Sequence, residues 1–253
     1  MSNHKLGRKP VRKLLSTPSL GDFVNKATTW PPVAAQGWEY AIPAGSLNIL
    51  GNDQFGDCAE AGAMHLIQAQ TANTGSPLQG TLEQTLALYS AVTGFNPNDP
   101  STDQGTDLLS LLQYWKTTGI TVTDNNGNPV VHKILGWAAL DLTSIAQIRY
   151  ANFVFGGTYL GINCPQSAEQ NTSNWTYQAG SPILGGHCIP GVGQGGAGGH
   201  IISWGLSIPF TWEFALQYLE EAYCIVTPAW VAANGKSPSG LDLNGLLAAM
   251  AAI

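Results

Sequence analysis

The sequence has little charge. Only 10% of its 253 residues are Asp, Glu, Lys or Arg, whereas about a quarter is usual in soluble domains. Its 10 basic residues are outnumbered by 16 acidic ones, which gives a net charge of −6. Because so few cations cannot build a domain-wide basic surface, nucleic acid is not an expected partner. A surface so poor in charge must be covered by small polar side chains or by partner molecules, and this hints at assembly.

Cysteines and long apolar runs are also scarce. The four cysteines form no Cys-x-x-Cys pair, so we expect free thiols in a reducing compartment and no zinc site. The sequence does not decide whether Cys164 and Cys188 form a disulfide. No apolar run approaches the roughly 18–20 residues that span a bilayer, and the charged N-terminus lacks the apolar core of a signal peptide. We expect a cytoplasmic or virion-associated protein with no membrane contact, no metal and no cofactor.

Half of the basic residues lie within the first thirteen positions, and they are Lys5, Arg8, Lys9, Arg12 and Lys13. Frequent Pro and Gly and a lack of periodicity predict an extended arm over residues 1–45, followed by a domain over 46–235 and a helical tail over 236–253. A basic arm ahead of an acidic body can bind phosphate or an acidic surface, and it could support self-assembly. A solvated tail and a propeptide-like block folded over a cleft are the alternatives.

The remaining sequence changes from helix signals to strand signals along its length. Helices are predicted at 57–73, 81–93, 106–118, 142–153 and 241–252, a hairpin within 120–136, a polar loop at 166–183, and strands at 158–163, 187–192, 200–204 and 222–227. Helices in the front half and strands in the back half favour an α+β fold.

Cys58 is the candidate nucleophile. It stands at the predicted start of a helix, directly after Gly56-Asp57. The unpaired N–H groups and the positive dipole end of a helix favour the thiolate, which is the reactive form of cysteine. A small buried residue that only packs the helix is the alternative.

A thiol nucleophile needs a base, and two histidines have suitable spacing. His187 lies 129 residues after Cys58 and His200 lies 142 residues after it, and both follow a pair of glycines. One class of cysteine peptidases places these residues roughly 130–150 positions apart, so spacing alone does not choose between them. His65, two helical turns from Cys58, is too distant for a direct hydrogen bond and is interpreted as structural.

Several segments together resemble papain-like cysteine peptidases. Residues 52–62, Asn-Asp-Gln-Phe-Gly-Asp-Cys-Ala-Glu-Ala-Gly, are similar to the family's nucleophile loop and helix. Their Gly-Asp-Cys sequence is closer to calpain-type and divergent bacterial or phage members than to papain itself. Residues 185–193, Gly-Gly-His-Cys-Ile-Pro-Gly-Val-Gly, resemble the histidine strand, and residues 202–205, Ile-Ser-Trp-Gly, resemble Asn-Ser-Trp-Gly. Residues 222–226 look like the closing strand, so the resemblance covers residues 45–230.

The resemblance implies a papain-like α+β fold, with the nucleophile helix in a helical left half and an antiparallel sheet as the right half. It implies that His187 is the partner of Cys58, because the run after His187 matches the family's histidine strand. The family's oxyanion-hole Gln, six residues before the nucleophile, corresponds to Asn52, and Gln54 is the fallback donor. Turn chemistry is the alternative for both side chains.

The sequence departs from the family pattern at Ile202, at Glu60 and at Ala59, which stands where papain and calpain usually carry a bulky aromatic residue. The Asn that orients the imidazole falls on Ile202, so Ser203 would have to take this role, and the rate should fall rather than vanish. Trp204 could shield that hydrogen bond from water or only pack the core. Glu60 would oppose thiolate formation if its side chain turned towards the site, and a solvated charge on the helix face is the alternative.

Two functions follow from these residues. The first is a thiol hydrolase, a peptidase or amidase, that cleaves a peptide or amide substrate with Cys58, His187, Ser203 and Asn52. The second is a catalytically weak or inactive structural or assembly protein on the same fold, with a phage-related origin. Fold alone does not choose between them.

Overall fold

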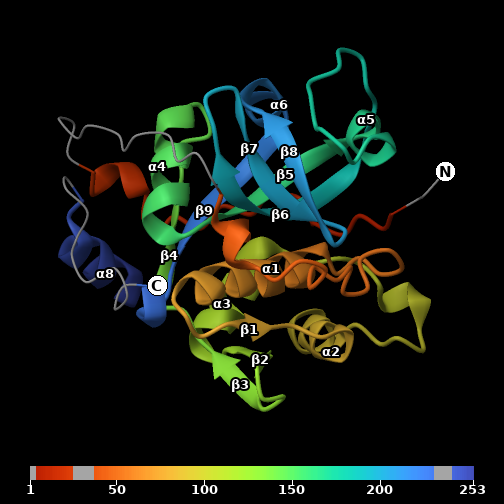
Figure 1. Cartoon of the computed structure of the whole chain (residues 1–253), viewed down its shortest axis with the longest axis horizontal. Helices are drawn as coiled ribbons and strands as arrows, with labels where there is room; N and C mark the ends of the chain where they lie inside the picture. The colour runs from red at the N-terminus through yellow and green to blue at the C-terminus, as the bar shows by residue number, and fades with distance from the viewer. Residues whose placement is uncertain (1–3, 25–36, 231–240) are drawn as a thin grey trace.

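A helix that is buried along nearly its whole length runs through the middle of the molecule. This computed structural model describes residues 4–24, 37–230 and 241–253, so the predicted boundary between residues 235 and 236 lies outside the described residues. Helix α1 (Cys58–Asn73) is buried from Cys58 to Thr71 and separates a helical half from a sheet half (Figure 1). Its alanines and Gly62 allow this close packing, since a Cβ on Gly62 would already touch the Cys188 sulfur at 3.4 Å.

The helical half lies on one side of α1 (Figure 1). Its elements are β1 (Leu78–Gln79), α2 (Leu82–Thr93), η3 (Pro100–Thr102), α3 (Leu108–Thr117), β2 (Ile120–Asp124) and β3 (Pro129–His132). The three strands form an antiparallel sheet in the order β1-β2-β3. A capping box between Thr81 and Gln84 begins α2, and the αL residue Gly94 ends it.

The sheet half contains a six-stranded antiparallel sheet in the order β4-β9-β5-β6-β7-β8. Its strands are β4 (Gly136–Ala139), β5 (Thr158–Pro165), β6 (Ile183–Gln194), β7 (Gly198–Ser203), β8 (Leu206–Thr211) and β9 (Leu219–Val226). The helices and 3-10 turns described outside the helical half and α1 are η1 (Leu20–Asp22), η2 (Trp38–Ala41), α4 (Ile145–Phe155), α5 (Gln166–Gln170), α6 (Trp212–Tyr218) and α8 (Leu243–Ala251).

Two hydrophobic cores meet at the sheet. Tyr159 of β5 and Cys188 of β6 belong to the core that contains α1 and α3, whereas the neighbouring Leu160 and Ile189 belong to the core with α4 and α6. Successive strand residues point to opposite faces, so both faces of the sheet are covered. None of the helices in the described residues is long and apolar enough to cross a membrane.

The predicted α+β class is confirmed, and most element boundaries agree within a few residues. The predicted polar loop at 166–183 is partly wrong, because it contains the short helix α5. The helix predicted at 142–153 begins later, at Ile145, where Ser144 caps it. Strand β8 and helix α6 were not predicted, since their short signals depend on tertiary packing. All four cysteines are free thiols.

We expect Leu66→Ala, in the middle of α1, to lower the free energy of unfolding by about 2–5 kcal/mol, because Leu66 is fully buried and the change leaves a cavity. Leu216→Ala is the matched control, since Leu216 is 51% exposed and surface changes stay within about 0.5 kcal/mol. Urea unfolding followed by circular dichroism measures both. Equal midpoints for the two variants would contradict the central role of α1.

Candidate active site

Cys58 and His187 lie where α1 packs on the sheet. Cys58 is the first residue of α1, and His187 lies in β6, the strand with which α1 makes its main contact with the sheet. The Cys58 thiol forms a backbone hydrogen bond with Cys188, the residue after His187. The structure therefore brings the two predicted catalytic residues to one seam between the halves, although no hydrogen bond joins their side chains.

Ser203 holds the His187 ring. Ser203 ends β7, the strand paired with β6, and its hydroxyl lies 2.7 Å from His187 Nε2. Ile202, the residue at the family's Asn position, is buried in a separate apolar cluster. Among the described residues, His187 Nδ1 is buried without a hydrogen-bond partner. The geometry thus gives Ser203 the orienting position and leaves one ring nitrogen unoccupied.

Trp204 covers the imidazole. Its ring stacks on His187 with centroids 4.8 Å apart and planes inclined by 19°. The ring of His4 stacks on Trp204 at 4.2 Å, and Trp175 packs against it edge-on. Trp204 adopts a φ of 50°, a left-handed conformation that is costly for a bulky residue. Such strain is tolerated at functional sites where the surroundings fix it, and here it directs the indole over His187.

Burial keeps both catalytic candidates neutral in this arrangement. It raises the pKa of the Cys58 thiol to about 12, although backbone hydrogen bonds with Cys188 and Gly7 oppose the rise. It lowers the pKa of His187 to about 3, and the nearby His4 and Arg8 charges add to this effect. The predicted thiolate is therefore not favoured in this arrangement, because desolvation is the largest effect on the pKa of Cys58.

Two carboxyl groups are buried beside the thiol. Glu60 is 0% exposed, so its interpretation as a solvated helix-face charge is wrong. It accepts a hydrogen bond of 2.7 Å from the Thr106 hydroxyl, and burial raises its pKa to about 8. Burial and the charge of Glu60 raise the pKa of Asp57 to about 9. Both carboxyl groups oppose ionisation of Cys58.

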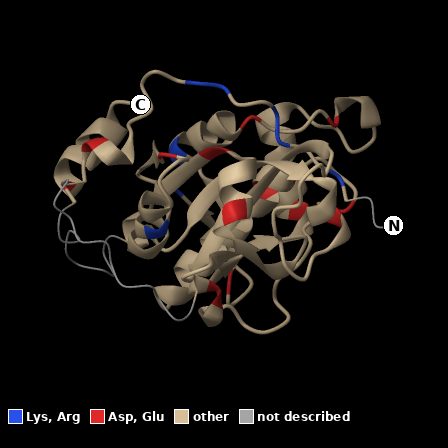
Figure 2. Cartoon of the chain, turned by 90° about the horizontal axis from the view of Figure 1, so that it is seen from above, with Lys and Arg blue, Asp and Glu red and all other residues tan. Residues whose placement is uncertain are grey.

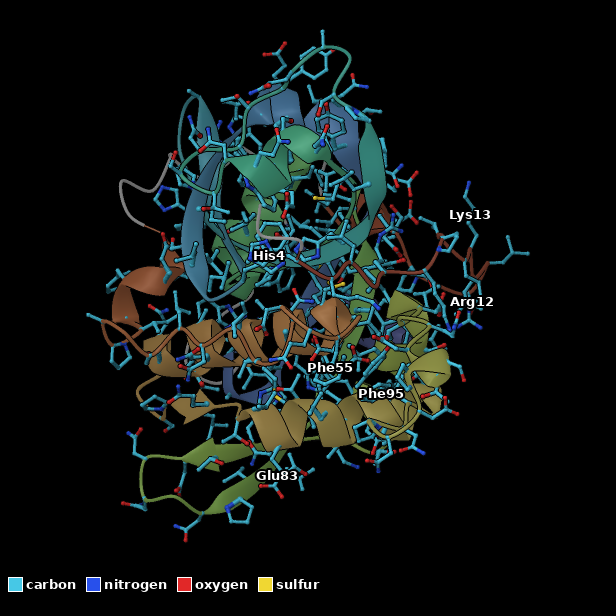
Figure 3. All side chains as sticks on the ribbon, turned by 90° about the vertical axis from the view of Figure 1, so that its right-hand side faces the viewer. His4, Arg12, Lys13, Phe55, Glu83 and Phe95 are labelled. Atoms are coloured by element: carbon cyan, nitrogen blue, oxygen red, sulfur yellow. The ribbon has the colours of Figure 1, made fainter. Side chains whose placement is uncertain are left out.

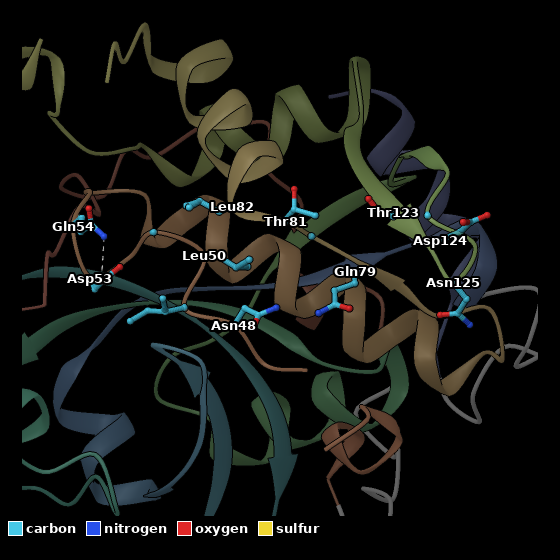
Figure 4. Close-up of a pocket in the computed structure, with 14 residues that line it drawn as sticks. Asn48, Leu50, Asp53, Gln54, Gln79, Thr81, Leu82, Thr123, Asp124 and Asn125 are labelled. Atoms are coloured by element: carbon cyan, nitrogen blue, oxygen red, sulfur yellow. Dashed lines mark hydrogen bonds between the residues drawn. The ribbon is translucent and has the colours of Figure 1, made fainter. Parts of the chain in front are cut away.

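The two candidate oxyanion donors lie in different surroundings. Asn52 is buried, and its amide donates to the carbonyls of Lys5, at 3.3 Å, and Phe55, at 3.4 Å. Gln54 is exposed and donates to Asp53 at 3.4 Å. It lies on the rim of a separate pocket of about 780 Å³ between the loop before α1 and the β2–β3 hairpin (Figure 4). Of the two, Asn52 is the one turned towards the seam.

The N-terminal segment, residues 4–9, fills the seam. The Arg8 N–H donates to the Gly186 carbonyl at 3.0 Å, next to His187, and the Lys9 N–H donates to the Thr106 carbonyl at 2.9 Å. The backbone N–H of Thr106 in turn donates to the Gly7 carbonyl at 2.7 Å. The segment is thus bonded to both halves, and Figure 3 shows the chain crossing between them from His4 towards Arg12 and Lys13. The alternative of a solvated tail is wrong for residues 4–9.

Glycines make room for this segment. A Cβ on Gly7 would collide with the Gly56 carbonyl, and one on Gly105 would collide with Gly7 itself. A Cβ on Gly186 would collide with the carbonyl of Arg8. Only glycine allows backbone to approach backbone so closely, so the body of the chain is shaped to hold an extended peptide at this place.

Few other groups could contribute chemistry. Most of the ribbon in Figure 2 is tan, the colour of residues other than Lys, Arg, Asp and Glu. His65 Nε2 lies 2.9 Å from the Asn48 carbonyl and burial lowers its pKa to about 4, which fits its structural interpretation. His200 lies away from the seam, paired with Glu39. In the described part of the chain, no three His, Cys, Asp or Glu side chains are grouped as metal ligands would be.

Sequence reasoning missed the burial of Glu60, and it gave an N-terminal block folded over the cleft only as an alternative, without the contacts that hold residues 4–9. The contrast between a basic N-terminus and an acidic body was the available signal for the segment. Lys5 pairs with Asp103 at 3.2 Å, and Arg8 pairs with Glu220 and Glu221 at 2.6 and 2.9 Å. Nothing in the sequence marks Glu60 as buried, because its neighbour Thr106 is distant along the chain.

Several solved structures with a similar fold are cysteine proteases. Xylellain, a cysteine protease from Xylella fastidiosa, aligns with a TM-score of 0.65 at 14% identity, over 90% of this chain and 98% of that one. ProCathepsin B S9 from Trypanosoma congolense aligns with a TM-score of 0.62 at 10% identity, over 88% and 86%. No protein-family model matches the sequence, and neither does any curated protein. The predicted papain-like fold is confirmed, and at these identities the likeness shows the fold alone.

The buried carboxyl groups predict a stability that falls as the pH rises above about 7, where histidines of the unfolded chain, with a pKa of about 6.5, have lost their charge. Between about pH 7 and about pH 8 the unfolded chain ionises Glu60 while the folded chain keeps its proton, so each pH unit costs about 1.4 kcal/mol per such group. Glu60→Gln should make this decline shallower by about that amount. Urea titrations at several pH values measure it, and Glu83→Gln, an exposed glutamate of α2, is the control. A decline as steep in Glu60→Gln as in the control would contradict the prediction.

Proposed function

We propose that this chain is a papain-like thiol hydrolase that cleaves peptide or amide bonds, with Cys58 as nucleophile and His187 as base. The observation that carries the proposal is the hydrogen bond between Ser203 and His187 Nε2. Trp204 stacks on the same ring. The other ring nitrogen, Nδ1, has no hydrogen-bond partner among the described residues. A base needs one ring nitrogen held and the other available, and this arrangement supplies both.

The proposed reaction uses an acyl-enzyme. His187 Nδ1 accepts the thiol proton as the Cys58 sulfur attacks the scissile carbonyl, and the imidazolium then gives this proton to the departing amine as the carbon–nitrogen bond breaks. Water, deprotonated by the same nitrogen, releases the carboxylic acid and restores the thiol. Asn52, with the backbone N–H of Cys58, would stabilise the negative oxygen of the tetrahedral intermediates.

The proposed enzyme is at rest in the arrangement described. The amide of Asn52 is occupied by the Lys5 carbonyl, and Gly7 lies against the Cys58 thiol. A substrate carbonyl therefore needs the place that residues 4–9 now fill. Departure of the segment would return water to the seam, which removes the desolvation that holds Cys58 and His187 neutral.

A structural role is the second candidate, and the filled seam favours it. A thiol with a pKa of about 12 beneath its own N-terminal segment is unreactive as it stands. A segment held by glycine-lined backbone contacts could serve only to join the two halves. Self-assembly through the arm and a phage-related origin stay predictions of the sequence.

Alkylation separates the two candidates. Iodoacetamide at about pH 6 should label the four buried cysteines of the unaltered chain slowly. Arg8→Ala, which loosens the segment, should speed the labelling of Cys58 alone, and adding His187→Ala should remove the gain, because an ordinary thiol labels slowly at that pH. Peptide mass spectrometry assigns the site, and Arg12→Ala, an exposed arginine of the same arm, is the control. Equal labelling of Cys58 and Cys224 in Arg8→Ala, without hydrolysis of fluorescently labelled casein, would favour the structural role.

Ser203→Ala tests the orienting role in the Arg8→Ala background. We expect kcat for casein hydrolysis to fall, but by less than the roughly 10²- to 10⁴-fold loss expected for His187→Ala, because the base remains and only its orientation is lost. The pH dependence of kcat should shift as well, since Ser203 contacts the titrating ring. A Ser203→Ala chain with unchanged kcat and pH profile would contradict the role.

A further inference from the structure

The guanidinium of Arg8 is enclosed by acceptors from the sheet half. Its side chain is 1% exposed. One terminal nitrogen donates to Glu221 at 2.9 Å, and the other donates to Glu220 at 2.6 Å and to Asn163 at 3.3 Å. The carbonyl of Ile162 accepts from two of its nitrogens, at 3.3 and 3.4 Å. A planar guanidinium with five donors fits this set better than the compact ammonium of lysine.

The body of the chain holds these acceptors in place without Arg8. The Tyr223 hydroxyl donates to the second oxygen of Glu221 at 2.9 Å, and the Asn163 amide donates to the second oxygen of Glu220. Gly161, in β5 opposite Glu221 of β9, leaves space for the arginine side chain, since a Cβ there would lie 2.7 Å from the Arg8 Cδ. Strands β5 and β9 therefore form a preorganised pocket.

The pocket adjoins the candidate catalytic residues. Gly7, directly before Arg8, forms a backbone hydrogen bond with the Cys58 thiol. The Arg8 N–H donates to the carbonyl of Gly186, directly before His187. An extended peptide that places one residue at the thiol therefore places the side chain of a neighbouring residue in this pocket.

We propose that this pocket is a guanidinium-binding subsite that selects peptide substrates with an arginine beside the cleaved bond, and that Arg8 occupies it in the resting chain. The binding of a guanidinium rests only on the contacts above, and the substrate preference rests in addition on the proposed hydrolase function. Departure of Arg8 leaves Glu221 buried and uncompensated, so the free pocket favours a ligand that restores the same bonds.

Binding to the full-length Arg8→Ala chain tests the pocket directly. N-acetyl-arginine methylamide should bind about 10- to 100-fold more tightly than N-acetyl-citrulline methylamide, which has nearly the same shape without the charge. Isothermal titration calorimetry measures both. Adding Glu221→Gln should reduce the difference, and Arg12→Ala should bind the arginine amide far more weakly than Arg8→Ala does, because the amide then has to displace Arg8. Equal affinities of the two amides for Arg8→Ala would overturn the proposal.

A second measurement uses the unaltered chain and does not depend on the folding of a variant. A tethered segment acts at an effective concentration of about a millimolar or more, so excess N-acetyl-arginine methylamide should displace Arg8 and speed iodoacetamide labelling of Cys58. The citrulline analogue at the same concentration should not. Identical labelling rates with the two amides would count against the subsite.

Hydrolysis then separates this proposal from the function on which part of it rests. The Arg8→Ala chain should cleave fluorogenic peptides that contain arginine with kcat/KM about 10-fold or more above matched citrulline peptides. Cleavage of both with equal kcat/KM would overturn the subsite and leave the hydrolase standing. Selective binding of the arginine amide without any cleavage would overturn the hydrolase function and leave the guanidinium pocket standing.

Discussion

The packing of the first turn of α1 against β6 is the contact on which the rest of the structure depends. It brings Cys58 beside Cys188 and so places the thiol and the neighbouring His187 at the same seam. Pairing of β6 with β7 then supplies Ser203 as a partner for the imidazole. Small residues along α1 allow this approach, because a larger side chain at Gly62 would separate the helix from the sheet.

The burial that fixes this geometry also keeps the groups of the candidate site uncharged. A thiol, an imidazole and two carboxyl groups are removed from water together, and each then favours its uncharged form. In the proposed hydrolase the thiol has to ionise, so this arrangement would be a resting one. Its activation would depend on residues 4–9, whose backbone occupies the place that we propose for a substrate.

Because the chain has few charged residues, several of its cations each form a specific ion pair. With so few basic residues in the chain, three of those near the N-terminus pair with acidic groups of the body: Lys5 with Asp103, Arg8 with Glu220 and Glu221, and Arg12 with Asp107. Of these contacts, only the one between Arg8 and Glu221 is buried on both sides, and removing one partner of a buried pair is strongly destabilising. The acidic pocket therefore holds the segment, and in our proposal it also binds a guanidinium ligand.

The sequence by itself determined the α+β class and the helix that begins at Cys58, because helix periodicity is carried by adjacent residues. The resemblance of its local motifs to papain-like peptidases favoured His187 over His200, which spacing alone did not. It also indicated Ser203 as the partner of the ring. Only the tertiary structure decided that Glu60 is buried and that Arg8 enters the body of the chain. Their partners are 46 and more than 200 residues away along the chain, and the pKa of a group depends on what surrounds it in space, which no local pattern encodes.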